Sequence, residues 1–416
     1  MPGPQLPFLE EGMARWPFGP PHAGIALDFT GPPPRLAELR ARVRERWAGL
    51  PRLAGQLVRD ERRPLSGWSR RHRWETPAAG HDPAGQVVGT DGPVTLQDAV
   101  RDWFHRPFPC GAPPWNLHLL KGPGDGEFTL LFRMHHSLLD GRSVTGLLRA
   151  LLDGCGPLDA GAAAAGPGEL RRTAAPGGQP GPLTAGLAVP LPRKGERRAA
   201  YAVLRLPPDL VRAAGRHPGA TTNTVFLAAV SGVLRSCLLT ASTSAPGAAP
   251  VWLSVPVDQR PADRGDFLGN AFCNVRLAAP VDRSAPTDRL AACAGLLTTV
   301  VRAPSRVEKL FEAAVTALPG PAQALARARL FAPAYAPAAC TYVHLRETGR
   351  TLAGRPLRRI TLVPMIPPDD TVTFALGGCA RGHTLSVFTN SGAEDADLLA
   401  ESFRHELALL AADRAP

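Results

Sequence analysis

Apolar positions in the first third of the chain switch between the spacing of amphipathic helices and the spacing of strands. Helical spacing is found in 35–57, 94–108 and 143–154. Two strand candidates, 115–120 and 127–136, lie between the second and third of these segments, and the sequence KGPGDG separates them. Its three glycines and one proline predict a hairpin turn. We therefore expect two helices, a pair of strands and a third helix, in that order.

The second half of the chain shows the same mixture of spacings. Strand patterns occur at 199–206, 250–261, 340–347, 357–366, 371–380 and 383–390, and a loop followed by a strand is expected over 265–280. Helical patterns occur at 208–217, 221–239, 286–303, 305–318 and 394–412. Because helices and strands are mixed in both halves, the sequence predicts an α/β protein with mixed sheets covered by helices.

A stretch rich in glycine, proline and alanine separates the two halves. Residues 155–197 have no sustained periodicity, which is typical of a linker. The sequence therefore predicts a first half over 1–154, a linker over 155–197 and a second half over 198–416.

The composition is that of a soluble, folded protein with a basic surface. Of the 416 residues, 44% are hydrophobic and 20% are charged, and the formal net charge is +11. The basic residues are mostly arginines spread along the chain, without a dense stripe that alternates with aromatics, so a nucleic-acid partner is not expected. A basic surface favours an anionic small molecule or a phosphorylated carrier.

The seven cysteines are dispersed and contain no C-x-x-C pair, so they fit neither a disulfide framework nor a zinc ribbon. A reducing cytoplasm is the expected setting. The first residues lack the basic segment and apolar core of a secretory signal. The longest apolar helix candidate breaks at Arg235, short of the ~20 residues that a membrane span needs. Peripheral contact with a membrane or lipid droplet stays open.

The sequence RMHHSLLDGRS, residues 133–143, is the clearest chemical feature. Adjacent side chains of a strand point to opposite faces, so His135 and His136 should differ, one buried behind the sheet and one facing a cleft. Asp140 can accept backbone N–H groups or pair with an arginine. Gly141 permits a close approach that a side chain would block.

A histidine facing a cleft is suited to move a proton, because its pKa lies near neutral pH. If the electrophile is an activated thioester, such a base needs no nucleophilic serine. Three other interpretations are weighed: both histidines as core residues, a metal site with His136 and Asp140, and a serine hydrolase. No second ligand cluster supports the metal, and no G-x-S-x-G elbow supports the hydrolase.

The motif H-H-x3-D-G resembles that of chloramphenicol acetyltransferase, peptide-synthetase condensation domains and bacterial wax ester synthases. The segments 50–57, 106–122, 128–143, 221–235, 255–261, 268–272 and 285–290 follow the order of the wax ester synthase/diacylglycerol acyltransferase family. This resemblance runs from about Leu36 to the C-terminus. It implies two chloramphenicol-acetyltransferase-like halves with a tunnel between them, which acyl-CoA and the acceptor enter from opposite mouths.

The resemblance also implies roles for individual residues. His136 would be the catalytic general base, with His135 and Asp140 as structural supports beside Gly141. The family's Asn-Asp pair falls on Asn223 and Thr224, so the asparagine is kept and the acid is lost.

Three residues are candidate substrate-binding groups. They are Asn223, Asn270 and Arg260. Each also has a plainer interpretation: Asn223 as the start of a helix, and Asn270 as a residue that forms a turn. Arg260 could pair with Asp140 or be solvated.

The leading hypothesis is therefore an acyl-CoA-dependent O-acyltransferase that acylates a long-chain alcohol or diacylglycerol, without a bound cofactor or metal. The alternative is a condensation-type acyltransferase that acylates a hydroxyl or amine of a specialised metabolite, from CoA or a carrier protein. A third hypothesis is a degenerate, non-catalytic binding module.

Overall fold

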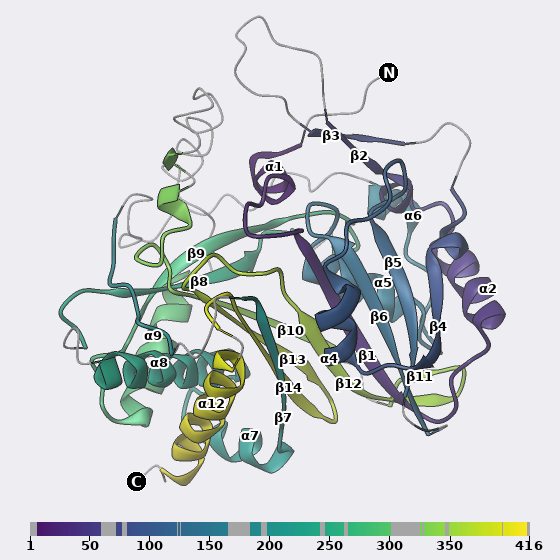
Figure 1. Cartoon of the computed structure of the whole chain (residues 1–416). Helices are drawn as coiled ribbons and strands as arrows, with labels where there is room; N and C mark the ends of the chain where they lie inside the picture. Colours follow the sequence, from purple (N-terminus) through teal and green to yellow (C-terminus); the bar gives the residue numbers. More distant parts are fainter. Residues whose placement is uncertain are drawn as a thin grey trace, which may run out of the picture.

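Two six-stranded sheets form the framework of the protein in the computed structural model (Figure 1). The structure describes residues 6–59, 72–76, 81–122, 124, 126–164, 184–192, 198–241, 246–261, 265–300, 325–326, 328–345, 349–392 and 394–413. The predicted helix at 305–318 lies outside these residues. The predicted α/β class with two subdomains is confirmed.

The first sheet has the strand order β11-β12-β1-β6-β5-β4. Its strands are β1 (His22–Thr30), β4 (Val87–Pro93), β5 (Trp115–Lys121), β6 (Glu127–His135), β11 (Thr351–Leu352) and β12 (Arg355–Val363). A two-stranded sheet of β2 (Gln56–Arg59) and β3 (His72–Glu75) lies beside it. The helices of this half are α1 (Phe8–Ala14), α2 (Leu36–Trp47), α3 (Pro51–Ala54), α4 (Leu96–Ala99), α5 (Gly141–Ala150) and α6 (Ala160–Ala164).

The second sheet has the order β7-β14-β13-β10-β8-β9. Its strands are β7 (Ala200–Leu206), β8 (Val251–Asp258), β9 (Phe272–Ala279), β10 (Ala338–Leu345), β13 (Val372–Cys379) and β14 (Gly382–Thr389). The helices are α7 (Pro208–Ala214), α8 (Thr222–Ala241), α9 (Pro286–Val300) and α12 (Asp395–Ala412).

Each half has its own apolar core. Phe132 of β6 and Trp47 of α2 lie in the core of the first half, where alternate residues of the strands face the helices. Phe374 of β13, Phe226 of α8 and Phe403 of α12 lie in the core of the second half. Burial of these alternating faces explains why the periodicity of the sequence predicted most elements.

Two strands cross from the second half into the first sheet. β12 pairs antiparallel with β1, with Leu27 opposite Ile360, although more than 300 residues separate them. β12 also lies against β13, where a Cβ on Gly377 would stand 2.3 Å from the carbonyl oxygen of Ile360. Only glycine permits this approach. The sheets therefore do not follow the predicted sequence boundary at 155–197, because residues 351–363 belong to the first sheet.

One predicted helix differs from the observed structure. The segment predicted as one helix over 94–108 forms α4 and then a single π-helical turn, Val100–Phe104. The helix predicted over 221–239 is observed as α8, and Arg235 interrupts only its apolar run, not the helix. The Arg235 side chain turns aside to donate to the carbonyl of Val281, 2.8 Å away.

Within the described part of the chain, α8 is long and apolar enough to cross a membrane. However, 67% of its apolar 18-residue segment is buried inside the protein. A core helix has the same signature.

Candidate active site

The paired histidines lie at the end of β6, on the turn that leads into α5. His135 is the last residue of β6, and its backbone N–H donates to the carbonyl of Pro114. The N–H of His136 donates to the carbonyl of Pro21, 2.8 Å away, before β1 begins. The turn is therefore tied to both neighbours of β6.

The two imidazoles have different surroundings. Nδ1 of His135 accepts from the hydroxyl of Ser137 at 2.7 Å. The ring of His136 packs 6.1 Å from the ring of Phe272, which comes from β9 of the second half. Nδ1 of His136 is enclosed and has no hydrogen-bond partner among the described residues, while both histidine side chains keep partial exposure. His136 thus lies where the halves meet.

Burial keeps His136 in the form that can accept a proton. Desolvation lowers the pKa of His136 below its usual value, against the opposing effects of a backbone acceptor and the negative charge of Asp140. The imidazole is therefore neutral at neutral pH, as a general base requires.

Asp140 anchors the loop after the histidines. Its backbone is extended, and Oδ1 accepts from the N–H of Ser143 at 2.9 Å, so that Asp140 caps α5. Its Oδ2 accepts from the N–H of Ala271 at 2.9 Å, in the loop before β9. The first turn of α5 lies close to β10, because a Cβ on Gly141 would stand 3.2 Å from Val343. One carboxylate therefore joins both halves.

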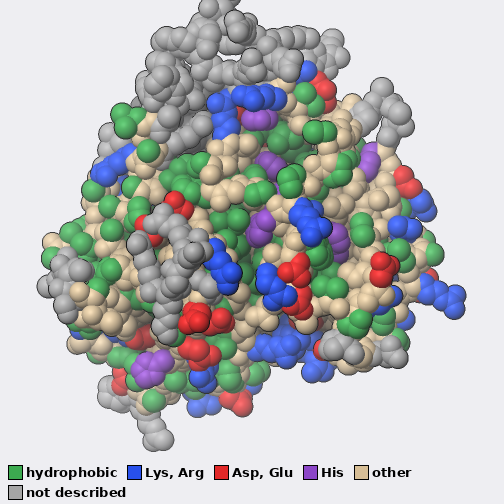
Figure 2. Space-filling view, viewed as in Figure 1, with side chains coloured by type: hydrophobic (Ala, Val, Ile, Leu, Met, Phe, Trp, Pro, Cys, Tyr) green, Lys and Arg blue, Asp and Glu red, His purple; other side chains and the backbone are tan. Residues whose placement is uncertain are grey.

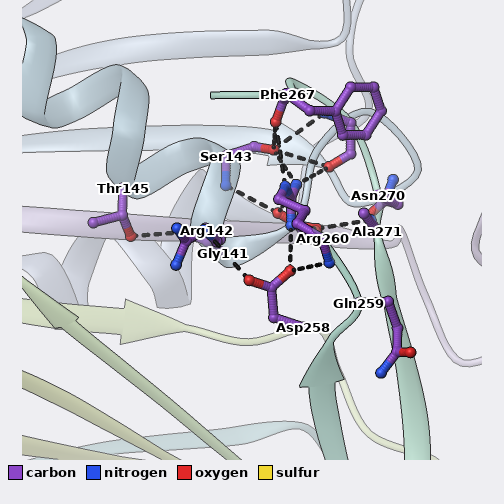
Figure 3. Close-up of polar contacts among 12 residues, drawn as sticks. Gly141, Arg142, Ser143, Thr145, Asp258, Gln259, Arg260, Phe267, Asn270 and Ala271 are labelled. Atoms are coloured by element: carbon purple, nitrogen blue, oxygen red, sulfur yellow. Dashed lines mark hydrogen bonds and ion pairs between the residues drawn. The ribbon is translucent and has the colours of Figure 1, made fainter. Parts of the chain in front are cut away.

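Arg260 completes this anchor from the loop after β8 (Figure 3). Its guanidinium lies 2.8 Å from Oδ2 of Asp140 and donates to the hydroxyl of Ser143 at 2.8 Å. It also donates to the carbonyl of Gly269 at 3.0 Å and lies 3.0 Å from Oδ1 of Asp258.

The Arg260 side chain is only 1% exposed. The pairing with Asp140 that the sequence analysis raised is therefore present. The guanidinium donates to groups of the protein itself, so a direct contact of Arg260 with substrate stays a prediction.

Asn270 holds the histidine loop from the second half. Its Nδ2 donates to the carbonyl oxygens of His136 and Ser137, at 3.2 and 2.9 Å. Its Oδ1 is buried and has no partner among the described residues. Asn270 therefore orients the loop and keeps one acceptor atom beside it.

Two residues that the sequence analysis missed support the same loop. Arg52 of α3 donates to the carbonyls of Ser137 and Leu138, at 3.1 and 2.9 Å. Glu10 of α1 accepts from Arg52 at 2.7 Å and from the indole N–H of Trp74 at 3.0 Å. Glu10 is 5% exposed. A signal for this cluster was present only for Arg52, which lies in the family-like segment 50–57.

Asn223 lies apart from this group, at the exposed start of α8. It lines a cavity between α8 and the strands β8, β9 and β10. Thr221 caps α8, because its hydroxyl accepts from the N–H of Thr224; the hydroxyl of Thr224, where the family has an acid, accepts from the N–H of Thr221 in return. The structure therefore brings His135, His136, Asp140, Arg260 and Asn270 together, whereas Asn223 lies beside a separate cavity.

Histidine and charged side chains gather over the region where the two halves meet, on the face shown in Figure 2. In the described part of the chain, no group of three or more His, Cys, Asp or Glu side chains is arranged to hold a metal ion. His136 lines neither the cavity beside Asn223 nor a second cavity lined by Ala278 and Arg283. The tunnel implied by the resemblance stays a prediction.

Four histidines of the first half, His135 and three that lie near Arg133, predict acid sensitivity. Burial lowers the pKa of His22 and His135 to about 3, and the pKa of His105 and His118 to about 4. For all but His135, the charge of Arg133 adds to this effect. In the unfolded chain these imidazoles take up protons near pH 6.5.

We expect the free energy of unfolding to fall as the pH drops below about 6.5, because only the unfolded chain then binds these protons. Between pH 6.5 and 5 the loss is roughly 2 kcal/mol for each histidine. Urea unfolding at a series of pH values measures this slope. His105→Phe should make the slope shallower by one proton, and equal stability at pH 7 and pH 5 would contradict the prediction.

Comparisons with known proteins agree with this geometry. Residues 92–160 match the model of the wax ester synthase/diacylglycerol acyltransferase catalytic domain. This segment includes β5, β6, the histidine loop and α5. The match confirms the resemblance and the prediction of an acyltransferase enzyme. No curated protein matches the chain.

Solved structures confirm the fold. The wax ester synthase/diacylglycerol acyltransferase from Marinobacter aquaeolei VT8 is 16% identical, with a TM-score of 0.60 over 98% of both chains. The first condensation domain of the CDA synthetase is 20% identical, with a TM-score of 0.66 over 100% of this chain and 97% of that one. The trichothecene 15-O-acetyltransferase from Fusarium sporotrichioides is 14% identical, with a TM-score of 0.64 over 98% and 95%.

Proposed function

We propose that the protein moves an acyl group from the thioester of acyl-CoA to the hydroxyl of a long-chain alcohol or diacylglycerol. One observation carries the proposal: a neutral imidazole, His136, lies on a loop that both halves hold in place. The catalytic-domain match over 92–160 supports the same class of substrates. With seven free cysteines, the proposed setting is the cytoplasm.

The proposed reaction is a direct transfer. His136 takes the proton of the acceptor hydroxyl while its oxygen attacks the thioester carbonyl. The carbon–sulfur bond then breaks, and the imidazolium returns the proton to the departing thiolate of CoA. The products are an ester and free CoA, and no acyl group is bound to the protein. Oδ1 of Asn270 is the proposed acceptor for an N–H or O–H of a substrate, because it has no partner among the described residues.

A second candidate function is a condensation-type acyltransferase of natural-product biosynthesis. Two findings favour it: the TM-score to a condensation domain, 0.66, exceeds that to the wax ester synthase, 0.60, and a trichothecene O-acetyltransferase shares the fold. The acceptor would then be a hydroxyl or amine of a specialised metabolite, and the donor CoA or a carrier protein.

Product analysis separates these functions. The protein is incubated with acyl-CoA thioesters and either a lipid or a metabolite extract, and new esters and amides are identified by mass spectrometry. We expect acylated alcohols or diacylglycerol, and none with the His136→Ala variant. Acylated metabolites alone would favour the second candidate. Binding of CoA without any product would overturn both and leave a binding module.

A further inference from the structure

The second sheet is split beside the candidate active site. β10 pairs with β8 only at Ala338 and Ala339, opposite Leu253 and Ser254. Both strands continue beyond this point, β8 to Asp258 and β10 to Leu345, but they no longer pair with each other. Figure 1 shows β8 and β9 leaving the direction of β10 and β13. A gap between strands of one sheet is unusual, because ladder hydrogen bonds normally satisfy the backbone.

An apolar cavity occupies this split. Its volume is about 220 Å³, and it lies between β8, β9 and β10 on one side and α8 and α9 on the other. Cys340 and Leu227 are fully buried parts of its wall, and Leu297 of α9 is half-buried. Polar groups occur near its exposed edge, at Asn223 and Asp258.

The edge of the cavity is connected to the loop of His136. Asp258 lies 3.0 Å from the guanidinium of Arg260, which holds Asp140. Asp258 is also the residue paired with Phe272, whose ring packs against that of His136. The edge of the cavity at Asp258 therefore lies opposite Phe272 in the sheet, and Phe272 contacts the proposed base, His136.

The cavity is partly open to the surface, and its volume indicates the size of the group that fits inside it. An apolar cavity of about 150 Å³ accepts benzene, with its six carbons. In proportion, 220 Å³ holds roughly eight or nine carbons. A palmitoyl chain is about twice that length.

We propose that this cavity binds the acyl chain of the donor and restricts it to medium length, near eight carbons. The proposal rests on the proposed acyl transfer and narrows its donor. Leu297 is the residue that sets the limit, because it lines the cavity from α9 and is only partly buried against the core. Leu296 is the matched control, since it lines a different cavity, with Ala278 and Arg283.

The test is a series of acyl-CoA donors from two to sixteen carbons, with kcat/KM measured for each. We expect a maximum near octanoyl-CoA. In Leu297→Trp, the ratio of kcat/KM for octanoyl-CoA to that for acetyl-CoA should fall at least tenfold, and Leu297→Ala should move the maximum to longer chains. Leu296→Trp should keep the original profile. A wild-type maximum at sixteen carbons, or an unchanged profile in Leu297→Trp, would overturn the proposal.

A binding measurement separates this proposal from the proposed function. Calorimetric titration compares octanoyl-CoA with CoA alone, in the wild type and in Leu297→Trp. If no acyl group is transferred, but the octanoyl chain tightens binding only in the wild type, the acyl pocket holds and the proposed reaction fails. If transfer occurs and the chain adds no affinity in either protein, the reaction holds and the pocket assignment fails.

Discussion

Replacing His136 by alanine is expected to lower kcat/KM by about 10³-fold, the largest effect of any single substitution in the site. Without this imidazole, the proposed base for the proton of the acceptor hydroxyl is missing. His136 is partly exposed and its Nδ1 has no partner in the described structure, so its loss should change the stability little. Steady-state kinetics with excess acyl-CoA measures the rate, and circular dichroism checks the fold.

The pH dependence of the wild type provides a second measurement of the same group. Because burial lowers the pKa of His136, the acid limb of kcat/KM should lie below the usual imidazole value of about 6.5. Activity should therefore persist at pH values where an exposed histidine would already be charged. If the alanine variant kept near-normal turnover, or if its kcat/KM kept the same acid limb, another group would be the base.

Removing Arg260 is expected to cost both stability and activity. In Arg260→Met the carboxylate of Asp140 stays buried without its ion pair, which destabilises a protein by about 3–5 kcal/mol. The loop between the histidines and α5 also loses its anchor to the second half. We expect kcat/KM to fall roughly 100-fold, as measured beside urea unfolding of the same variant.

A double variant distinguishes positioning from simple stability. Asp140→Asn combined with Arg260→Met removes the buried charge as well as its partner, so part of the lost stability should return. Activity should not return, because the loop is still without its anchor. The control is Arg142→Met, since Arg142 pairs with Asp258 from a side chain that is 58% exposed and should contribute less than about 1 kcal/mol. Full activity in Arg260→Met would exclude a positioning role.

The strand, turn and helix around the histidines were predictable because each depends on neighbouring residues. The short apolar run of β6 follows from burial of both faces of the strand over 130–134. The capping of α5 by Asp140 follows from the preference of aspartate for that position.

Other features depend on residues far apart in the chain, and the sequence carries little signal for them. The pairing of β12 with β1 is of this kind, as is the contact of Glu10 with Arg52. A buried carboxylate that meets an arginine 42 positions away leaves no periodic pattern. From the sequence, Asp140 was only one of several possible partners of Arg260, because a lone arginine that follows a strand is usually solvated.

The exchange of β11 and β12 between the halves has a consequence for synthesis of the chain on the ribosome. Until residue 363 has been made, β1 has an unpaired edge where β12 will later bind. The first sheet therefore cannot be completed while the nascent chain is short, although its own helices and hairpin are already present. Completion of this sheet becomes a late event that waits for nearly the whole polypeptide, and fragments that end before β12 would expose an edge open to aggregation.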